Sequence, residues 1–342
     1  MNQPPIFIVG SPRSGTSLMR TILNRHPDLA ICNETHFLQL VYQARRRRAF
    51  GDLKDANARR RLVEEYVATQ RMRRLGMDSA LLTERLLHEG ISYRALFACL
   101  LDCYAESQGK RRCGEKTPQH ARISETLCEW FPGAIILHML RDPRAAVASL
   151  QQQPWASRSA VTSARNWLAC NLGARRSSHR SEYLEVRYET LVTQPEAEVA
   201  RICSFLGEEY FSSMLIPNDV PPPRFPVERI YTPITAERIG TWREELTDEQ
   251  VAQVEWVVGD HLQTFGYPRE APPASRLSIV RGLSVAAADF VRRGVAARPA
   301  GWYYYLRPKE LVKQESWRRR YNWRDEPAGP PPPALTRTAS GR

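Results

Sequence analysis

A short apolar run that enters a glycine-containing loop constrains the fold of this chain more than any other feature. Residues 6–9 read Ile-Phe-Ile-Val, which is the pattern of a buried strand. Gly10 and Gly15 follow with the spacing of the two glycines in the phosphate-binding loop G-x-x-x-x-G-K-[ST]. We therefore predict a strand over 5–9, a loop over 10–16 and a helix over 17–26, with an anion held at the start of the helix.

The cation of this loop is displaced from its usual place. Thr16 stands where the pattern has lysine, and Arg13 lies inside the loop instead. Backbone N–H groups at the helix start can still hold an anionic group, and they belong to Ser14, Gly15, Thr16 and Ser17. The missing lysine would be needed to reach a γ-phosphate, so a P-loop kinase that uses ATP and magnesium is only a distant alternative. A noncatalytic nucleotide-binding protein is another.

The loop and the residues after it resemble the PAPS-dependent sulfotransferases, and most closely their tyrosylprotein branch. The matching residues run from Gly10 to Arg20 and include His26-Pro27 and Glu34-Thr35. PAPS is 3′-phosphoadenosine 5′-phosphosulfate, the sulfuryl donor of that family. The resemblance implies that Arg13 and the loop N–H groups hold the 5′-phosphosulfate and that no metal is required.

An arginine and a serine further along the chain resemble the 3′-phosphate motif of the same family. The apolar run 134–140 predicts a central parallel strand; Arg141 follows it, and Ser149 comes eight residues later. A planar guanidinium can bind a phosphate with two hydrogen bonds, and a serine hydroxyl adds another donor. The resemblance therefore implies that Arg141 and Ser149 bind the 3′-phosphate.

Two further segments extend the resemblance. Residues 183–192 resemble a strand motif R-Y-E-x-L, whose tyrosine lies near the nucleotide and corresponds to Tyr188. Residues 238–243 resemble the loop that closes over the nucleotide, so Arg238 and Trp242 are expected to contact it. The four motifs follow the family order and span residues 6–243.

The resemblance also implies residues for the transfer step. Glu34 lies twenty-one residues after Arg13, where the tyrosylprotein branch has its catalytic glutamate, and it would take the proton of the acceptor hydroxyl during in-line attack. Lys116 matches a lysine near the transferred group, so Arg13 and Lys116 are expected to stabilise the developing negative charge. His36 is the rival base, because other sulfotransferase branches use histidine.

Alternating strand and helix patterns predict the α/β class, as a P-loop-like, doubly wound parallel sheet flanked by helices, with a helical insertion and a C-terminal extension. Strands are also expected at 183–187 and, as a short edge, at 30–33, and one amphipathic helix over 246–265. The predicted units are a sulfotransferase domain over 1–268 with a mainly helical insertion at 37–107, a helical and aromatic extension over 269–325, and a disordered tail over 326–342.

The net charge of +12 and three arginine-rich stretches at 45–48, 59–61 and 71–74 favour an anionic partner. A nucleotide or an acidic peptide satisfies this as well as nucleic acid does, and no zinc-finger spacing or RNP signature is present, so nucleic acid is not expected. The stretches are interpreted as a solvated helical face, with an acceptor-docking surface as the alternative. The acceptor stays open between a peptidyl tyrosine and a small phenol, alcohol or glycan, since His36 stands where the tyrosylprotein branch has arginine.

Cysteine usage and hydropathy bear on the compartment. Seven cysteines without a C-x-x-C pair indicate reduced thiols. The first strand begins within a few residues of Met1, and no stretch approaches the ~20 apolar residues of a membrane span. We expect a cytoplasmic protein without a transmembrane segment. A homodimer is one alternative for the oligomeric state.

Overall fold

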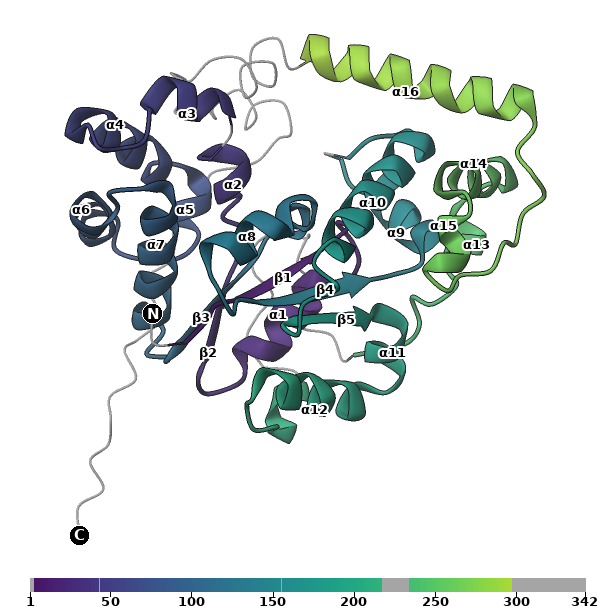
Figure 1. Ribbon diagram of the computed structural model, residues 1–342. Helices are drawn as coiled ribbons and strands as arrows, with labels where there is room; N and C mark the ends of the chain where they lie inside the picture. The colour runs from purple at the N-terminus through teal and green to yellow at the C-terminus, as the bar shows by residue number, and fades with distance from the viewer. Residues whose placement is uncertain (1–2, 43, 155, 217–233, 297–342) are drawn as a thin grey trace.

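The computed structural model describes residues 3–42, 44–154, 156–216 and 234–296 of the 342-residue chain. These residues fold around a single parallel sheet with helices on both faces (Figure 1). The predicted tail and most of the predicted C-terminal extension lie outside the described residues.

Five parallel strands form the sheet in the order β2-β3-β1-β4-β5. They are β1 Ile6–Gly10, β2 Leu29–Cys32, β3 Arg112–Lys116, β4 Ile135–Leu140 and β5 Tyr183–Arg187. β3 and β4 pair with opposite sides of β1, so the chain winds outward from the centre in both directions. The predicted α/β class and the predicted edge position of the strand near residue 30 are confirmed.

Helices connect the strands. The α-helices of the described residues are α1 Thr16–Asn24, α2 Phe37–Leu40, α3 Ala44–Phe50, α4 Ala56–Val67, α5 Gln70–Arg73, α6 Ser79–Glu89, α7 Tyr93–Ser107, α8 Ser124–Trp130, α9 Pro143–Gln151, α10 Ala160–Arg175, α11 Tyr188–Thr193, α12 Pro195–Leu206, α13 Trp242–Glu245, α14 Asp248–Val258, α15 His261–Thr264 and α16 Arg276–Ala296. Two 3₁₀ segments are η1 Pro118–Ile123 and η2 Ser212–Leu215. Helices α2–α7 gather at one end of the sheet (Figure 1), where α7 packs on β2 and β3.

The alternation of side chains along β1 explains the two helical layers. Ile6 and Ile8 point to one face, where they pack with residues of α1, β4 and α12. Phe7 and Val9 point to the other face, where they pack with α2, α4, α6, α7 and α8. All four side chains are at most 1% exposed, as the continuous apolar run predicts for a central parallel strand. This burial fixes the loop after β1 at the carboxyl edge of the sheet.

Two elements differ from what the sequence predicts. Local sequence indicates no strand at 112–116, because Arg-Cys-Gly-Glu-Lys is polar, yet β3 forms between β1 and β2, where both neighbours supply its backbone hydrogen bonds. The single helix predicted over 246–265 is wrong. α14 ends at Val258, and Gly259, with a φ of 60°, separates it from α15.

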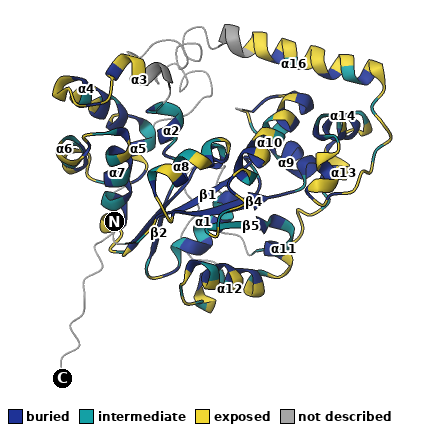
Figure 2. Cartoon of the chain, viewed as in Figure 1, coloured by how far each residue is buried: buried dark blue, intermediate teal, exposed yellow. Residues whose placement is uncertain are grey.

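The last described helix, α16, docks through its polar and small residues. Ser278, Gly282 and Asp289 are buried against the protein; Gln253 Nε2 donates to the Ser278 carbonyl at 2.9 Å, and the Ser157 hydroxyl donates to Asp289 Oδ2 at 2.6 Å. Figure 2 shows the rest of α16 as largely exposed. Its exposed apolar side chains are Leu277, Val280, Leu283, Val285, Phe290 and Val291. No helix in the described ranges has both the length and the apolar character to cross a bilayer.

Candidate functional site

The loop after β1 reverses direction through residues with positive φ. A Cβ atom at Gly10 would overlap the Met139 carbonyl of β4, and one at Gly15 would lie 2.6 Å from Tyr188 Cδ2. Only glycine fits such close approaches at φ values of 151° and 87°. Arg13, between them, adopts a φ of 71°, which is costly for a residue with a side chain. The loop therefore holds Arg13 in an unfavourable backbone conformation, which fixes where its side chain begins.

Arg13 lies in one cluster with the predicted 3′-phosphate residues. Its Nε donates to Ser149 Oγ at 3.1 Å, and Arg141 Nη1 donates to the Arg13 carbonyl at 3.0 Å. Arg141 Nη2 donates to the Arg238 carbonyl at 3.2 Å, and the Arg141 guanidinium stacks 4.1 Å from the centre of the Tyr188 ring. The loops after β1 and β4 thus face the same region.

This donor cluster, defined as Arg13, Arg141, Ser149 and Tyr188, carries positive charge without a matching carboxylate. Burial, and next the charges of Arg141 and Arg238, lower the pKa of Arg13. In the part of the chain that the structure describes, neither Arg13 nor Arg141 forms an ion pair. Arg141 Nε and Ser14 Oγ are buried, and neither atom has a hydrogen-bond partner among the described residues. Buried donors without acceptors suit an anionic ligand.

Of the remaining predicted cofactor residues, Thr16, Ser17 and Arg238 adjoin this cluster, whereas Trp242 packs in a core with residues of α9, α10 and α14. Thr16 is buried at the start of α1, and Ser17 follows it in the first turn. Arg238 reaches Arg141 with its carbonyl group, while its guanidinium pairs with Glu245 at 3.2 Å. Trp242 is only 4% exposed. Two guanidinium groups lie over its ring, those of Arg144 and Arg243, at 4.5 Å and 4.4 Å from the ring centre.

Three of the four residues predicted for the transfer step, or as its rival base, lie together at the ends of β2 and β3, and the fourth, Arg13, belongs to the donor cluster. Lys116 Nζ donates to Glu34 Oε1 at 2.7 Å, and His36 Nε2 lies 3.1 Å from Glu34 Oε2. Arg71 Nη1 of α5 lies 3.8 Å from Glu34 Oε2. We call this group the transfer cluster: Glu34, His36, Lys116 and Arg71. It contains three basic side chains around one carboxylate.

Ionisation in the transfer cluster is set by burial and by these contacts. Burial alone would raise the pKa of Glu34, but the Lys116 charge and the hydrogen bond from His36 outweigh it and hold that pKa well below its usual value. Burial lowers the pKa of His36, the hydrogen bond with Glu34 raises it, and the Arg71 charge lowers it, with a net lowering. At neutral pH, Glu34 is therefore ionised and His36 is neutral.

Four residues that contact the candidate site, or hold it in place, are not predicted by the sequence: Arg71, Glu115, Thr117 and Thr35. Arg71 belongs to an arginine-rich stretch interpreted as a solvated face, and no local pattern brings it to Glu34. Glu115 and Thr117 flank Lys116, and Thr35 separates the two candidate bases; all three are buried and bonded to one another. The sequence carries no signal for Glu115, because the polar residues 112–116 do not indicate a strand. Its burial at the end of β3 is evident only from the structure.

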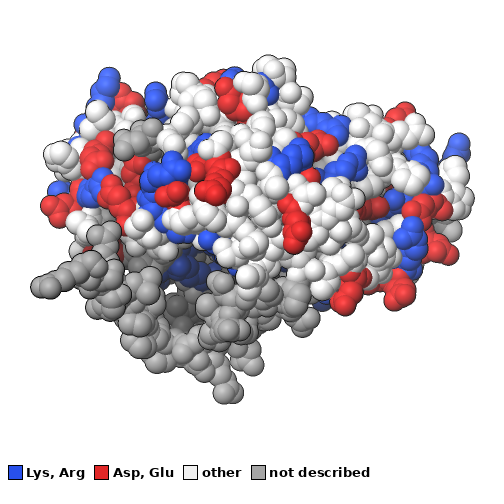
Figure 3. Space-filling view, turned by 90° about the horizontal axis from the view of Figure 1, so that it is seen from below, with Lys and Arg blue, Asp and Glu red and all other residues white. Residues whose placement is uncertain are grey.

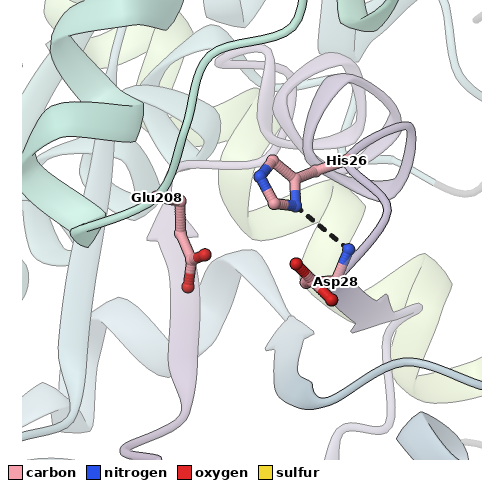
Figure 4. A group of neighbouring side chains, drawn as sticks. All are labelled: His26, Asp28 and Glu208. Carbon is pink, nitrogen blue, oxygen red and sulfur yellow. Dashed lines mark hydrogen bonds between the residues drawn. The ribbon is translucent and has the colours of Figure 1, made fainter.

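One other group of side chains has the composition of a metal site. Among the described residues, His26, Asp28 and Glu208 bring their ligand atoms within 4.8 Å of one another (Figure 4). His26 Nδ1 accepts from the Asp28 N–H at 3.1 Å, and both carboxylates pair with arginines, Asp28 with Arg111 at 3.1 Å and Glu208 with Arg112 at 3.0 Å. The ligand atoms are already used, so the group acts as a charge-balanced cluster.

Comparison with known proteins agrees with this geometry. A profile of the Sulfotransferase family matches residues 4–212. The chain therefore belongs to the sulfotransferase family. Nodulation protein NoeE of Sinorhizobium fredii is 27% identical over 311 residues, covering 82% of this chain and 70% of NoeE. The protein-tyrosine sulfotransferase of Drosophila melanogaster is 26% identical, covering 79% of this chain and 53% of that protein.

Two further similarities are to a shorter stretch of a curated protein and to a solved structure. Carbohydrate sulfotransferase 7 of Mus musculus is 30% identical over 108 residues, covering 30% of this chain and 22% of that protein. Among solved structures, the sulfotransferase domain of the Synechococcus PCC 7002 olefin synthase is 20% identical, with a TM-score of 0.45, and covers 83% of this chain and 94% of that domain. The family assignment itself rests on the sequence profile.

Proposed function

We propose that this sulfotransferase moves the sulfuryl group of PAPS to an acceptor hydroxyl. The observation that carries the proposal is the donor cluster, in which Arg13, Arg141 and Ser149 join the loops after β1 and β4 through direct hydrogen bonds. Neither arginine forms an ion pair with a carboxylate in the described residues, which favours a ligand with more than one anionic group. PAPS has charged groups at both its 3′ and 5′ positions.

The residues present fit such a nucleotide. Ser14 Oγ and Arg141 Nε are buried donors left without partners among the described residues, and Gly15 leaves room that a Cβ would fill against Tyr188. Arg13 and the N–H groups at the start of α1 would hold the 5′-phosphosulfate, and Arg141 with Ser149 would hold the 3′-phosphate. Tyr188, Arg238 and Trp242 would complete the nucleotide site. When bound, PAPS supplies the activated sulfuryl group.

In the transfer cluster, Glu34 is proposed to receive the proton of the acceptor hydroxyl. Its carboxylate is ionised at neutral pH and partly open to solvent, at 34% side-chain exposure. Arg13 and Lys116 are proposed to stabilise negative charge that develops on the side of the donor. Neither role requires a metal ion.

His36 remains the second candidate for the base, and two observations favour it. Both Glu34 oxygens already have partners, Lys116 and His36, and a strongly lowered pKa makes Glu34 a weak proton acceptor. His36 is neutral near pH 7, and when its Nε2–H donates to Glu34, its Nδ1 carries the free electron pair. Glu34 would then orient the imidazole.

The acceptor is proposed to be a peptidyl tyrosine, with a small phenol, alcohol or glycan as the alternative. The tyrosine proposal is supported by the Drosophila relative's name and by Glu34 at the position implied by that branch. The likeness to mouse carbohydrate sulfotransferase 7 supports a glycan. On the face shown in Figure 3, Lys and Arg side chains alternate with Asp and Glu, so the net charge of +12 is not gathered there as one basic patch for an acidic partner.

The decisive experiment is mass spectrometry of an acceptor panel incubated with PAPS and the protein. The panel contains acidic tyrosine peptides, their phenylalanine counterparts, small phenols, alcohols and oligosaccharides. A mass increase of one sulfuryl group on a hydroxyl acceptor supports the proposal, and its dependence on the tyrosine ring separates peptide from glycan. Products with ATP but none with PAPS would overturn it.

Two further proposals concern the cellular compartment and the oligomeric state of the protein. We propose a reducing compartment, the cytoplasm, because all seven cysteines are free thiols and six of them are buried. A homodimer remains an open proposal. Sedimentation velocity of the purified full chain tests it directly.

A further inference from the structure

The turn between β2 and α2 carries both candidate bases and is held by a buried carboxylate. Thr35 separates Glu34 from His36 in this turn. Glu115 of β3 pairs in register with Cys32, the last residue of β2, and is 0% exposed. A fully buried carboxylate is expensive unless its oxygens are bonded, so its partners show what it stabilises.

Three groups, which belong to Thr35 and Thr117, donate hydrogen bonds to one oxygen of Glu115. Oε1 accepts from the Thr35 N–H at 3.0 Å, from the Thr35 hydroxyl at 2.8 Å and from the Thr117 hydroxyl. His120 Nδ1 lies 3.1 Å from Oε2. Burial would raise the pKa of Glu115, but the His120 charge and the donated hydrogen bonds outweigh it and keep that pKa below its usual value. The carboxylate therefore stays ionised inside the fold and binds Thr35 by charge-assisted hydrogen bonds.

Thr35 is bonded on its other sides as well. Its Oγ1 accepts from the Phe37 N–H at 3.1 Å, and its carbonyl accepts from the Tyr66 hydroxyl of α4 at 3.1 Å. Thr117 Oγ1 accepts from the His36 N–H at 3.3 Å. Every polar atom of Thr35 thus has a partner, from β3, from α4 or from the start of α2. The turn cannot shift without breaking several buried hydrogen bonds.

His36 pays a conformational cost in this turn. Its φ of 49° and ψ of 29° place it in the left-handed region, which is unfavourable for a residue with a side chain. The conformation aims its ring at Glu34, with Nε2 3.1 Å from Oε2. Successive side chains of a strand point to opposite faces, and accordingly Glu115 contacts Thr35 while Lys116 contacts Glu34. The two contacts hold the turn from two sides.

We infer that Glu115 and Thr35 are positioning residues for sulfuryl transfer: together they lock the turn in which Glu34 and His36 meet and in which Glu34 reaches Lys116. This inference rests on the proposed function for its catalytic meaning. Neither residue touches the donor cluster, which is built on the loops after β1 and β4. Loosening the turn should therefore lower kcat and leave nucleotide affinity unchanged.

The test compares Thr35→Val with Thr35→Ser. Valine keeps the branched shape and the N–H but removes the hydroxyl, whereas serine restores it. We expect kcat of Thr35→Val to fall roughly 10- to 100-fold, because small displacements of a catalytic group have effects of this size, with an unchanged Kd for 3′,5′-ADP. Thr35→Ser should recover most of the rate. Glu115→Gln, which keeps acceptor oxygen but loses the charge, is the second variant if Thr35→Val does not fold.

A matched control separates positioning from general destabilisation. Ser124 is buried and its hydroxyl bonds with the Gly173 carbonyl at 3.2 Å and with Ser177 Oγ at 2.8 Å, neither of which belongs to the turn. Ser124→Ala should lower stability without a change in kcat per folded molecule. If Ser124→Ala and Thr35→Val lower kcat alike, in proportion to the loss of folded protein, the positioning role is refuted.

The pH dependence of kcat gives a readout that instability alone would not move. Lys116 and His36 lower the pKa of Glu34, so if Glu34 is the base, a loosened turn shifts the acid limb to higher pH. Glu34 raises the pKa of His36, so if His36 is the base, the same variant shifts that limb to lower pH. A limb that stays in place in Thr35→Val contradicts the inference.

A titration that needs no turnover keeps this inference separate from the proposed function. The His36 ring protons, assigned by their loss in His36→Gln, are followed by NMR across pH in the parent and in Thr35→Val. Loss of the Glu34 contact should lower the pKa of His36. Identical curves would overturn the positioning role, whereas a shifted curve in a chain that sulfates no acceptor would uphold it and reject only the proposed function.

Discussion

The donor cluster and the transfer cluster arrange their charged side chains in opposite ways. In the donor cluster, Arg13 and Arg141 bond to a hydroxyl and to backbone carbonyls, and burial, followed by the charge of Arg141, lowers the pKa of Arg13. In the transfer cluster, Lys116, His36 and Arg71 all converge on the carboxylate of Glu34. The two clusters therefore differ in their bonded carboxylates: in the described residues none is bonded to Arg13 or Arg141, whereas Glu34 is bonded to or paired with every basic side chain of the transfer cluster.

The largest effect is expected from Glu34→Gln, which removes the negative charge of the transfer cluster while keeping the shape of the side chain. We expect kcat to fall about 10²- to 10⁴-fold, the usual range for loss of a general base, with nucleotide affinity intact. Single-turnover assays and calorimetry with 3′,5′-ADP measure the two quantities. Glu89→Gln, which alters an exposed carboxylate paired with Arg85, is the control. If transfer survives Glu34→Gln but not His36→Ala, the base is His36.

Arg141→Ala should affect only the donor cluster. Loss of a charge-assisted, bidentate contact is worth about 2–3 kcal/mol, so affinity for 3′,5′-ADP should fall roughly 30- to 150-fold, while affinity for 5′-AMP stays the same. Competition binding with both nucleotides provides the measurement. Arg201→Ala, which breaks an ion pair with Glu198 on α12, should change neither affinity. Equal affinity of the parent protein for the two nucleotides would show that no 3′-phosphate site exists here.

Salt should act on the two clusters unequally. Raising ionic strength from about 50 mM to about 500 mM should weaken binding of 3′,5′-ADP about tenfold, because salt screens the attraction of Arg13 and Arg141 for its phosphates. The KM for an uncharged acceptor should change little, because salt screens interactions between charges and such an acceptor carries none. Steady-state kinetics at several salt concentrations decide this. A parallel rise of both constants would mean that the clusters are electrostatically alike.

Acid should remove stability that originates in the transfer cluster. The folded-state pKa of Glu34 lies well below the ordinary value of 4.5, so the stability from its contacts is present above pH 4.5 and is lost as pH falls toward the folded-state pKa. The parent should therefore exceed Glu34→Gln in free energy of unfolding at pH 7, and the gap should narrow below pH 4.5. Urea unfolding at both pH values measures it, and a constant gap would contradict the assigned contacts.

The smallest effect is expected from Arg71→Gln. Arg71 lies 3.8 Å from Glu34 Oε2 and is 36% exposed, so solvent screens the pair. We expect a change in kcat of no more than a few fold. A fall as large as that of Glu34→Gln would mean that Arg71 touches the acceptor or the transferred group. The kinetic assay is the one used for Glu34→Gln.

Local patterns predict the frame of the donor side better than that of the transfer side. The strand at 5–9 and the loop glycines follow from apolar-run and loop patterns, whereas the roles of Arg141 and Ser149, like those of Glu34 and Lys116, are implied by the family resemblance. The structure brings Arg13, Arg141 and Ser149 together, and it brings Glu34 and Lys116 together. β3 has no such pattern, because its polar residues are buried by neighbours that lie far apart in the sequence. Contacts such as Tyr66 with Thr35, or Arg71 with Glu34, depend on how α4 and α5 pack, which periodicity does not specify.

Gly15 and Tyr188 come from opposite halves of the sulfotransferase profile, yet they share a single volume. A methyl group at position 15 would stand 2.6 Å from the ring of Tyr188, and that ring in turn supports the guanidinium of Arg141. A bulkier residue at position 15 would require a smaller one at position 188, and that change would remove the surface on which the Arg141 guanidinium rests. One shared volume thereby couples the loop after β1 to the helix after β5.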